Sequence, residues 1–288
     1  MRMNISSPEP LGSHISLWGE GPLWHRDRLL YVDIEGHKVL SFDPVSGAEI
    51  ILDVGERVGT VVARERGGLV FAGEHGFSFL DETSGAITHI ADPEADKPGN
   101  RFNDGKCDPS GRFWAGTMPL AHRRPEAALY CLDTKLTVTK KFSPVTVSNG
   151  LVWTRDAQTM FYIDTPRRNV LAFNFDVAIG EITNERVAFD TSAFYGNPDG
   201  MAIDTEDRLW IAFCHGSAVR CFDPRTGQCE AEIVLPCREV TACAFGGPAL
   251  TDLYITTGRP GADIEPLAGR LFVTRPGVTG VVSHTFAG

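Results

Sequence analysis

The chain has 288 residues, a formal net charge of -10 at pH 7 and a hydrophobic fraction of 42%. This hydrophobic fraction is ample for a packed core, and neither composition nor charge indicates disorder. The acidic balance argues against a nucleic-acid-binding protein, which would normally have a basic face, and no apolar run approaches the length of a membrane span.

Short runs of β-branched and aromatic residues, separated by Gly, Asp, Pro and Asn turns, extend along the whole chain. No stretch has the apolar spacing of an amphipathic helix, so the sequence predicts an all-β protein. The runs form six successive units: 21–25, 29–33, 38–42 and 49–53; 60–64, 68–72, 76–80 and 86–90; a start at 104, then 112–116, 128–132 and 136–142; a start at 149, then 160–164, 169–175 and 182–189; a start at 199, then 208–213, 218–222 and 229–235; and 241–245, 252–256 and 270–274.

Units of four strands that repeat roughly every 40 residues are typical of a β-propeller. The turn Phe-Asp-Pro-x-(Ser/Thr)-Gly occurs at 42–47 and again at 222–227, as expected for equivalent edges of two blades. A β-sandwich is the alternative, but its strands do not repeat in groups of four. We therefore predict one domain over residues 1–288, a six-bladed β-propeller with four-stranded antiparallel blades around a central channel. The sixth unit is one strand short, and we expect either 14–18 or 281–286 to complete it.

An oxygen-bearing side chain precedes a glycine at the start of four units, in the pairs Glu20-Gly21, Asp104-Gly105, Asn149-Gly150 and Asp199-Gly200. Because the first strand of each blade lines the channel, we expect these side chains, or Asn103 in place of Asp104, to meet at one mouth. Converging carboxylates repel, and a divalent cation is the simplest compensation. Oxygen ligands suit Ca²⁺, Mg²⁺ or Mn²⁺, although Zn²⁺ or Fe²⁺ would also fit. Alternatively, the pairs only form turns between blades.

The loops that follow the second strands should reach the same mouth, and two of them carry His75 and His215. A single loop histidine is more often solvated than bound to substrate, so both interpretations stay open. The chain has no nucleotide-binding, zinc-protease or serine-hydrolase motif.

Five segments of the chain resemble motifs of the regucalcin / gluconolactonase / luciferin-regenerating enzyme family. They are Trp-Gly-Glu-Gly-Pro-Leu-Trp at 18–24, Asn-Arg-Phe-Asn-Asp-Gly-Lys at 100–106, Phe-Trp-Ala-Gly-Thr-Met at 113–118, Ser-Asn-Gly-Leu at 148–151 and Pro-Asp-Gly-Met at 198–201. The tail from 268 to 288 is also similar to regucalcins, so the resemblance covers nearly the whole chain.

The resemblance implies a six-bladed propeller that hydrolyses a sugar lactone with one divalent metal ion (Ca, Zn, Mn, Mg or Fe) in the channel mouth. By motif match, the metal ligands are Glu20, Asn149 and Asp199, with Asp199 also the catalytic acid or base, and the substrate-holding residues are Arg101 and Asn103. One departure concerns the family's Ala-Glu-Glu after Gly-Thr-Met. Here the run is Met-Pro-Leu-Ala, so the family's substrate contact is missing at Ala121.

The leading hypothesis is therefore a metal-dependent lactonase, a carboxylic-ester hydrolase of the gluconolactonase type. The alternatives are an organophosphate or aryl-ester hydrolase and a calcium-binding regulatory protein of the regucalcin type. Arg101 and Asn103 favour an enzyme, because a calcium store needs no substrate clamp. Asp104 is the alternative to Asp199 as the base.

Seven scattered cysteines without a Cys-x-x-Cys pair indicate reduced thiols. Residues 1–8 lack the apolar stretch of a signal peptide. We therefore expect a cytoplasmic protein, a monomer or weak homo-oligomer, with a small-molecule sugar lactone as its partner and no nucleic-acid or membrane partner.

Overall fold

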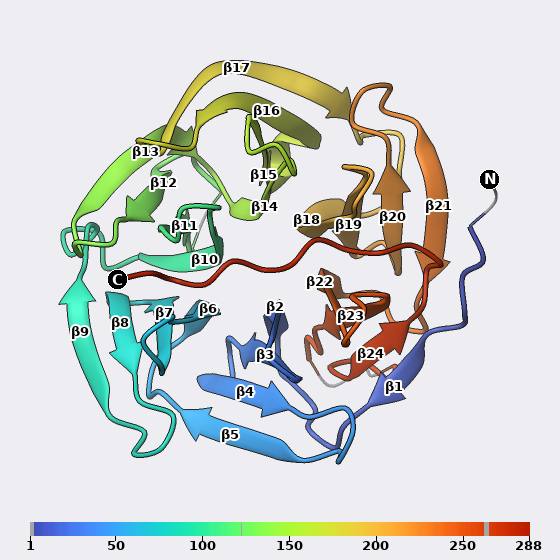
Figure 1. Ribbon diagram of the computed structural model, residues 1–288, viewed down its shortest axis with the longest axis horizontal. Coiled ribbons are helices and arrows are strands. Elements are labelled where there is room, and N and C mark those ends of the chain that lie inside the picture. The colour runs from blue at the N-terminus through green and yellow to red at the C-terminus, as the bar shows by residue number, and fades with distance from the viewer. Residues whose placement is uncertain (1–2, 122, 262–264) are drawn as a thin grey trace.

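The computed structural model describes residues 3–121, 123–261 and 265–288. Within these ranges the strands form six four-stranded sheets, and a single 3₁₀ turn at Thr165–Arg167 is the only helix. All strand pairs within the sheets are antiparallel, and the sheets stand in a ring around a central axis (Figure 1). The prediction of an all-β, six-bladed propeller is confirmed.

Each blade runs from an innermost strand at the axis to an outermost strand at the periphery (Figure 1). From inside to outside the blades contain β2 (Gly19–His25), β3 (Arg28–Asp33), β4 (Lys38–Phe42) and β5 (Glu49–Asp53); β6 (Val58–Ala63), β7 (Leu69–Gly73), β8 (Gly76–Leu80) and β9 (Ile87–Ala91); β10 (Asn100–Cys107), β11 (Phe113–Pro119), β12 (Ala127–Leu132) and β13 (Val138–Val145); β14 (Ser148–Trp153), β15 (Thr159–Asp164), β16 (Asn169–Asp176) and β17 (Glu181–Asp190); β18 (Asn197–Ile203), β19 (Leu209–Cys214), β20 (Ala218–Phe222) and β21 (Cys229–Val234); and β22 (Val240–Gly246), β23 (Asp252–Thr257), β24 (Leu271–Thr274) and β1 (Glu9–Leu11).

The hydrophobic core lies between neighbouring blades. Trp114 of the third blade packs edge-on against Trp153 of the fourth, and Trp210 of the fifth against Phe245 of the sixth. The second strand of each blade is therefore covered on both faces, and β7, β15 and β19 appear in the sequence as nearly continuous apolar runs. The outermost strands are mostly exposed, which explains their weaker apolar signal.

The sixth blade is closed by β1, so the expectation that 14–18 or 281–286 completes it is wrong. Glu9 pairs with Val273 and Leu11 with Leu271, which joins the two ends of the chain in one sheet. β1 is short, exposed and contains Pro10, a residue tolerated on an edge strand but untypical of strands in general. A pattern of apolar alternation therefore misses it.

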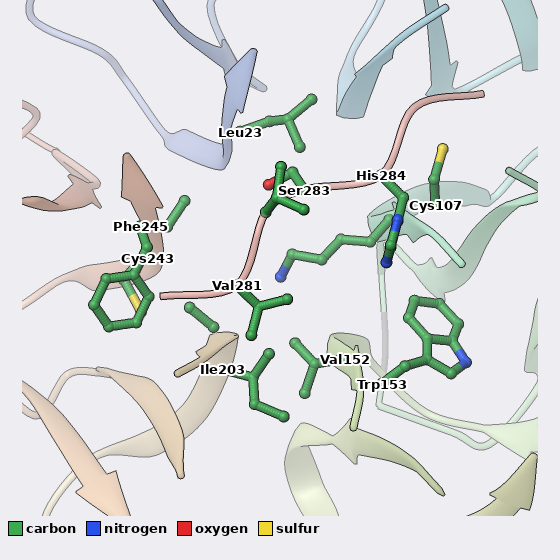
Figure 2. Close-up of a pocket in the computed structure, with 14 residues that line it drawn as sticks. Leu23, Cys107, Val152, Trp153, Ile203, Cys243, Phe245, Val281, Ser283 and His284 are labelled. Atoms are coloured by element: carbon green, nitrogen blue, oxygen red, sulfur yellow. The ribbon is translucent and has the colours of Figure 1, made fainter. Parts of the chain in front are cut away.

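Residues 280–287, here called the C-terminal strap, run across the axis instead of joining a blade (Figure 1). Val281 N–H donates to the carbonyl of Ile203 at 3.2 Å, and Phe286 N–H donates to that of Ala63 at 2.8 Å. Ile203 and Ala63 are the last residues of β18 and β6, so the strap covers the C-terminal ends of the innermost strands. Figure 2 shows the apolar pocket under it.

No helix in the described ranges is long and apolar enough to cross a membrane.

Candidate metal and substrate site

Each innermost strand is irregular near its N-terminal end. The hydrogen-bonded register shifts between Glu20 and Leu23, Val58 and Thr60, Phe102 and Gly105, Asn149 and Leu151, Pro198 and Met201, and Val240 and Ala242. Such β-bulges bend a strand and change the direction of its side chains, and they are frequent beside functional sites. The oxygen-bearing residues found in the sequence lie at four of these six positions.

Two of the four glycines, Gly150 and Gly200, are explained by the neighbouring blade. A Cβ atom on Gly150 would lie 2.7 Å from the carbonyl oxygen of Asp199, and one on Gly200 would lie 2.4 Å from Cβ of Ala242. Both distances are too short for a side chain, because the innermost strand of the next blade passes directly alongside. These glycines allow adjacent bulges to approach, and this brings the site residues of different blades together.

A pocket of about 400 Å³ lies at this end of the axis, opposite the strap. All five site residues predicted from the sequence line it: Glu20, Arg101, Asn103, Asn149 and Asp199. Asp104 is buried next to them, and its charge acts on both Glu20 and Asp199. Of the two loop histidines, His215 lines the pocket, whereas His75 does not. The backbone N–H of His75 donates a hydrogen bond to the Glu56 carboxylate.

Three buried carboxyl groups dominate the electrostatics of the site. Burial, and then the charge of Asp104, raise the pKa of Glu20 to about 8. Burial, Glu20 and Asp104 together raise the pKa of Asp199 well above its usual range, and burial raises the pKa of Asp104. Ionising all three groups is therefore costly unless a positive charge is bound beside them.

The donor atoms fit a divalent cation. Among the described residues, Asp104 Oδ2 and Asp199 Oδ1 are buried and accept no hydrogen bond. Buried polar atoms are rarely left without a partner, so these oxygens indicate a ligand. Carboxylate and amide oxygens are the donors that hard divalent ions prefer. Glu20, Asn149 and Asp199 would supply such a set, with Asp104 as an additional negative charge nearby.

The orientation of the Asn149 amide is fixed by Thr165, which the sequence analysis did not identify. The Thr165 hydroxyl donates to the carbonyl of Pro198 at 2.8 Å, so its lone pair accepts Asn149 Nδ2, also at 2.8 Å. The amide nitrogen is therefore directed at Thr165, and Oδ1 accepts from Asn103 Nδ2 and keeps one lone pair for the site. Thr165 lies in the 3₁₀ turn after β15, and nothing in its local sequence distinguishes it from a turn residue.

Arg101 and Asn103 are connected to the same network. Arg101 Nη1 donates to Asn103 Oδ1 at 2.7 Å, and Asn103 Nδ2 donates to Asn149 Oδ1 at 3.1 Å and to the carbonyl of Ser148 at 2.7 Å. Burial lowers the pKa of Arg101 to about 10, so it stays charged at neutral pH. Its Nε is buried without a partner in the described structure and remains available as a donor.

We expect the stability of the chelator-treated protein to fall as the pH rises from about 4.5 towards about 8. The pKa of Glu20 is about 8 in the fold, compared with an ordinary value of 4.5. Between these values the folded state therefore binds more protons than the unfolded state. Stability then decreases with increasing pH. Urea denaturation across the window measures the effect, and Glu20→Gln, which lacks this titration, should show a shallower decline. Stability that rises with pH in both proteins would contradict the assignment.

Comparisons with known proteins show what the chain as a whole is similar to. The family model of the SMP-30/Gluconolactonase/LRE-like region matches residues 18–259. Regucalcin of Danio rerio is 40% identical over 280 residues, which cover 94% of this chain and 95% of that protein. A calcium-binding protein, regucalcin, from Agrobacterium tumefaciens has a TM-score of 0.92 and 26% identity over 98% of this chain and 97% of its own. A luciferin-regenerating enzyme has a TM-score of 0.90 and 28% identity over 98% and 99%.

Proposed function

The chain belongs to the SMP-30/gluconolactonase/LRE-like family, and from this premise we propose that it is a lactonase that opens a sugar lactone with the help of one divalent metal ion. The observation that carries the proposal is the meeting of Glu20, Asn149 and Asp199 in one pocket with the free guanidinium donor of Arg101. A protein that only stores metal needs Glu20, Asn149 and Asp199 but has no use for Arg101.

Glu20, Asn149 and Asp199 would hold the ion, which when bound supplies a Lewis acid for the lactone carbonyl or for a water molecule. Reconstitution with single metals would identify the ion as Ca, Zn, Mn, Mg or Fe. The fixed Asn149 amide and the bulged inner strands keep these donors in place before substrate arrives. This preorganisation reduces the reorganisation that the reaction requires.

Asp199 is proposed to move the proton. The oxygen of water bonds to the lactone carbonyl carbon, the bond from that carbon to the ring oxygen breaks, and the product is an open-chain hydroxy acid. Asp199 takes the proton from the attacking water and returns it to the departing ring oxygen, so no proton is gained or lost overall. Asp199 lines the pocket, whereas Asp104 is buried and is not among the residues that line it, and this favours Asp199 over Asp104 as the base.

Arg101 and Asn103 are proposed to hold the substrate. An arginine offers a planar fork of donors to hydroxyl or carbonyl oxygens and cannot bind a cation. Both amide hydrogens of Asn103 and one lone pair of Oδ1 are already used by Ser148, Asn149 and Arg101. Asn103 therefore reaches the substrate through its remaining oxygen lone pair, and also fixes Arg101 relative to Asn149.

We expect Arg101→Ala to lower kcat/KM about 10- to 100-fold while one metal ion per chain is retained, since a hydrogen bond from a charged donor is worth roughly 1.5–3 kcal/mol. Steady-state kinetics and metal analysis of the same preparation measure this. Arg101→Lys keeps the charge and removes the fork, so it should recover only part of the loss. Stoichiometric loss of metal in Arg101→Ala would instead place Arg101 among the residues that support the ion.

The function is tested by hydrolysis of a panel of compounds after chelation and reconstitution with single metals. The proposal requires that the reconstituted protein opens aldonolactones and that the chelated protein does not. Faster turnover of phosphotriesters or aryl esters would favour the organophosphate or aryl-ester hydrolase, because the same site would polarise a phosphoryl oxygen. Tight calcium binding without turnover of any compound would favour a calcium-binding regulatory protein.

We also propose that the protein works in the cytoplasm, as one domain over residues 1–288. All seven cysteines are unpaired, six of them buried. Unpaired buried thiols are typical of proteins kept in a reducing compartment.

A further inference from the structure

His215, which lines the pocket, meets a buried carboxylate that has no part in the proposed metal and substrate set. His215 follows β19 of the fifth blade, and Glu239 precedes β22 of the sixth. The His215 side chain is 56% exposed, whereas that of Glu239 is 3% exposed. His215 Nδ1 lies 2.9 Å from Glu239 Oε1 and 2.7 Å from Oε2. The Nδ1 edge of the ring therefore contacts the protein, while the rest of the ring is open to solvent.

Glu239 holds His215 through its backbone as well. The His215 N–H donates to Glu239 Oε2 at 3.1 Å, and the Cys214 thiol donates to the same oxygen at 3.2 Å. His215 has a φ of 61°, in the left-handed region that non-glycine residues seldom adopt. Such conformations persist only where the surroundings enforce them, and they are concentrated at functional sites. The carboxylate thus determines both where His215 lies and how its ring is turned.

The bond to Glu239 also determines what the other ring nitrogen can do. An ionised carboxylate only accepts, so Nδ1 carries the proton in this pair. Nε2 of the neutral ring then has a lone pair and makes no hydrogen bond to any part of the chain that the structure describes. A fixed acceptor on the wall of a pocket suits a hydroxyl group.

We propose that His215 is a specificity-determining residue whose Nε2 accepts a hydrogen bond from a hydroxyl group of the substrate, remote from the carbonyl that reacts, and that Glu239 positions it. This inference rests on the proposed function for the identity of the substrate as a polyhydroxylated lactone. The inference is supported by the pocket itself, because His215 lines the same pocket as Glu20 and Asp199. The chemistry needs no further metal, cofactor or covalent step.

The alternative use of this cluster is a second metal site, since ligand atoms of Cys214, His215 and Glu239 lie within 4.8 Å of one another. Their separations are those of hydrogen bonds, and Glu239 already accepts three donors. Burial, Asp199 and Glu239 also raise the pKa of the Cys214 thiol, which opposes the thiolate that a metal needs. The hydrogen bonds among Cys214, His215 and Glu239 therefore account for the cluster as a network that orients His215.

The test compares His215→Asn with wild type. Asparagine keeps a donor at the place of Nδ1, so it preserves the bond to Glu239 and removes only Nε2. His215→Gln reaches as far as Nε2 with an amide and serves as the rescue variant. Glu239→Gln keeps an acceptor but loses the charge that fixes the ring. None of these substitutions changes a residue proposed to bind the metal.

Two readouts are needed. The first is steady-state hydrolysis of glucono-δ-lactone and of δ-valerolactone, which has the same ring without hydroxyl groups. We expect His215→Asn to raise KM for the hydroxylated lactone by about three- to tenfold, the value of one hydrogen bond, with little change in kcat and none in KM for δ-valerolactone. His215→Gln should recover part of the loss, and Glu239→Gln should show a smaller effect in the same direction.

The second readout is calorimetric binding of glucono-δ-lactam, which is not hydrolysed, with metal analysis of every variant. Weaker lactam binding by His215→Asn supports the inference even if the protein hydrolyses no lactone, in which case the proposed function alone fails. Equal lactam binding by both proteins, or equal KM shifts for the two lactones, overturns the inference. So does wild-type protein that binds no lactam, or a second metal ion per chain that His215→Asn loses.

Discussion

Asp199→Asn is expected to lower kcat for lactone hydrolysis by about 10²- to 10⁴-fold while the protein still binds metal. Asparagine keeps an oxygen donor at the position but cannot accept the proton of the attacking water. General acid–base catalysis by a well-placed carboxylate contributes a factor of this size. Asp199 also depends on the ion for its ionised form, because burial, Glu20 and Asp104 raise its pKa. The measurement is steady-state turnover with metal content determined on the same sample.

Asp104→Asn is the matched comparison, since Asp104 is equally buried and also precedes a glycine. It should reduce turnover much less, because Asp104 does not line the pocket. If Asp199→Asn keeps its metal and works within about tenfold of wild type, Asp199 is a ligand only, and Asp104 becomes the candidate base.

Glu20→Gln is expected to weaken metal binding by more than about an order of magnitude, since a charged oxygen ligand is replaced by a neutral one at a buried position. Competition with a chelator of known affinity measures the change. Glu206→Gln is the control, because the Glu206 side chain is 70% exposed and lies after β18, at the strap end of the axis. Equal metal affinity of wild type and Glu20→Gln would remove Glu20 from the ligand set.

The blades could be predicted from the sequence because the second strands are buried on both faces and two blades share the same turn before their outermost strand. The strands expected in the sixth blade were right, but its closing strand was not, because β1 contributes only three exposed or half-buried residues, one of them a proline. Edge strands carry little apolar pattern, so their place is decided by tertiary pairing.

The convergence of Glu20, Asn149 and Asp199 could be predicted because equivalent positions of successive blades meet at the axis. His215 could also be singled out from its loop position, but the residues that orient these side chains could not. Thr165 orients Asn149 through a loop hydrogen bond, and Glu239 orients His215 from a different blade. Contacts of this kind depend on how blades pack, and no local spacing in the sequence encodes them.

The strap has a kinetic consequence for the proposed enzyme. With the C-terminal ends of the inner strands covered by residues 280–287, the hydroxy acid leaves through the opening by which the lactone entered. A new lactone can then enter only after the hydroxy acid has left. Accumulated product competes directly with substrate for the free enzyme, and net flux through the reaction follows the rate at which the cell removes the acid.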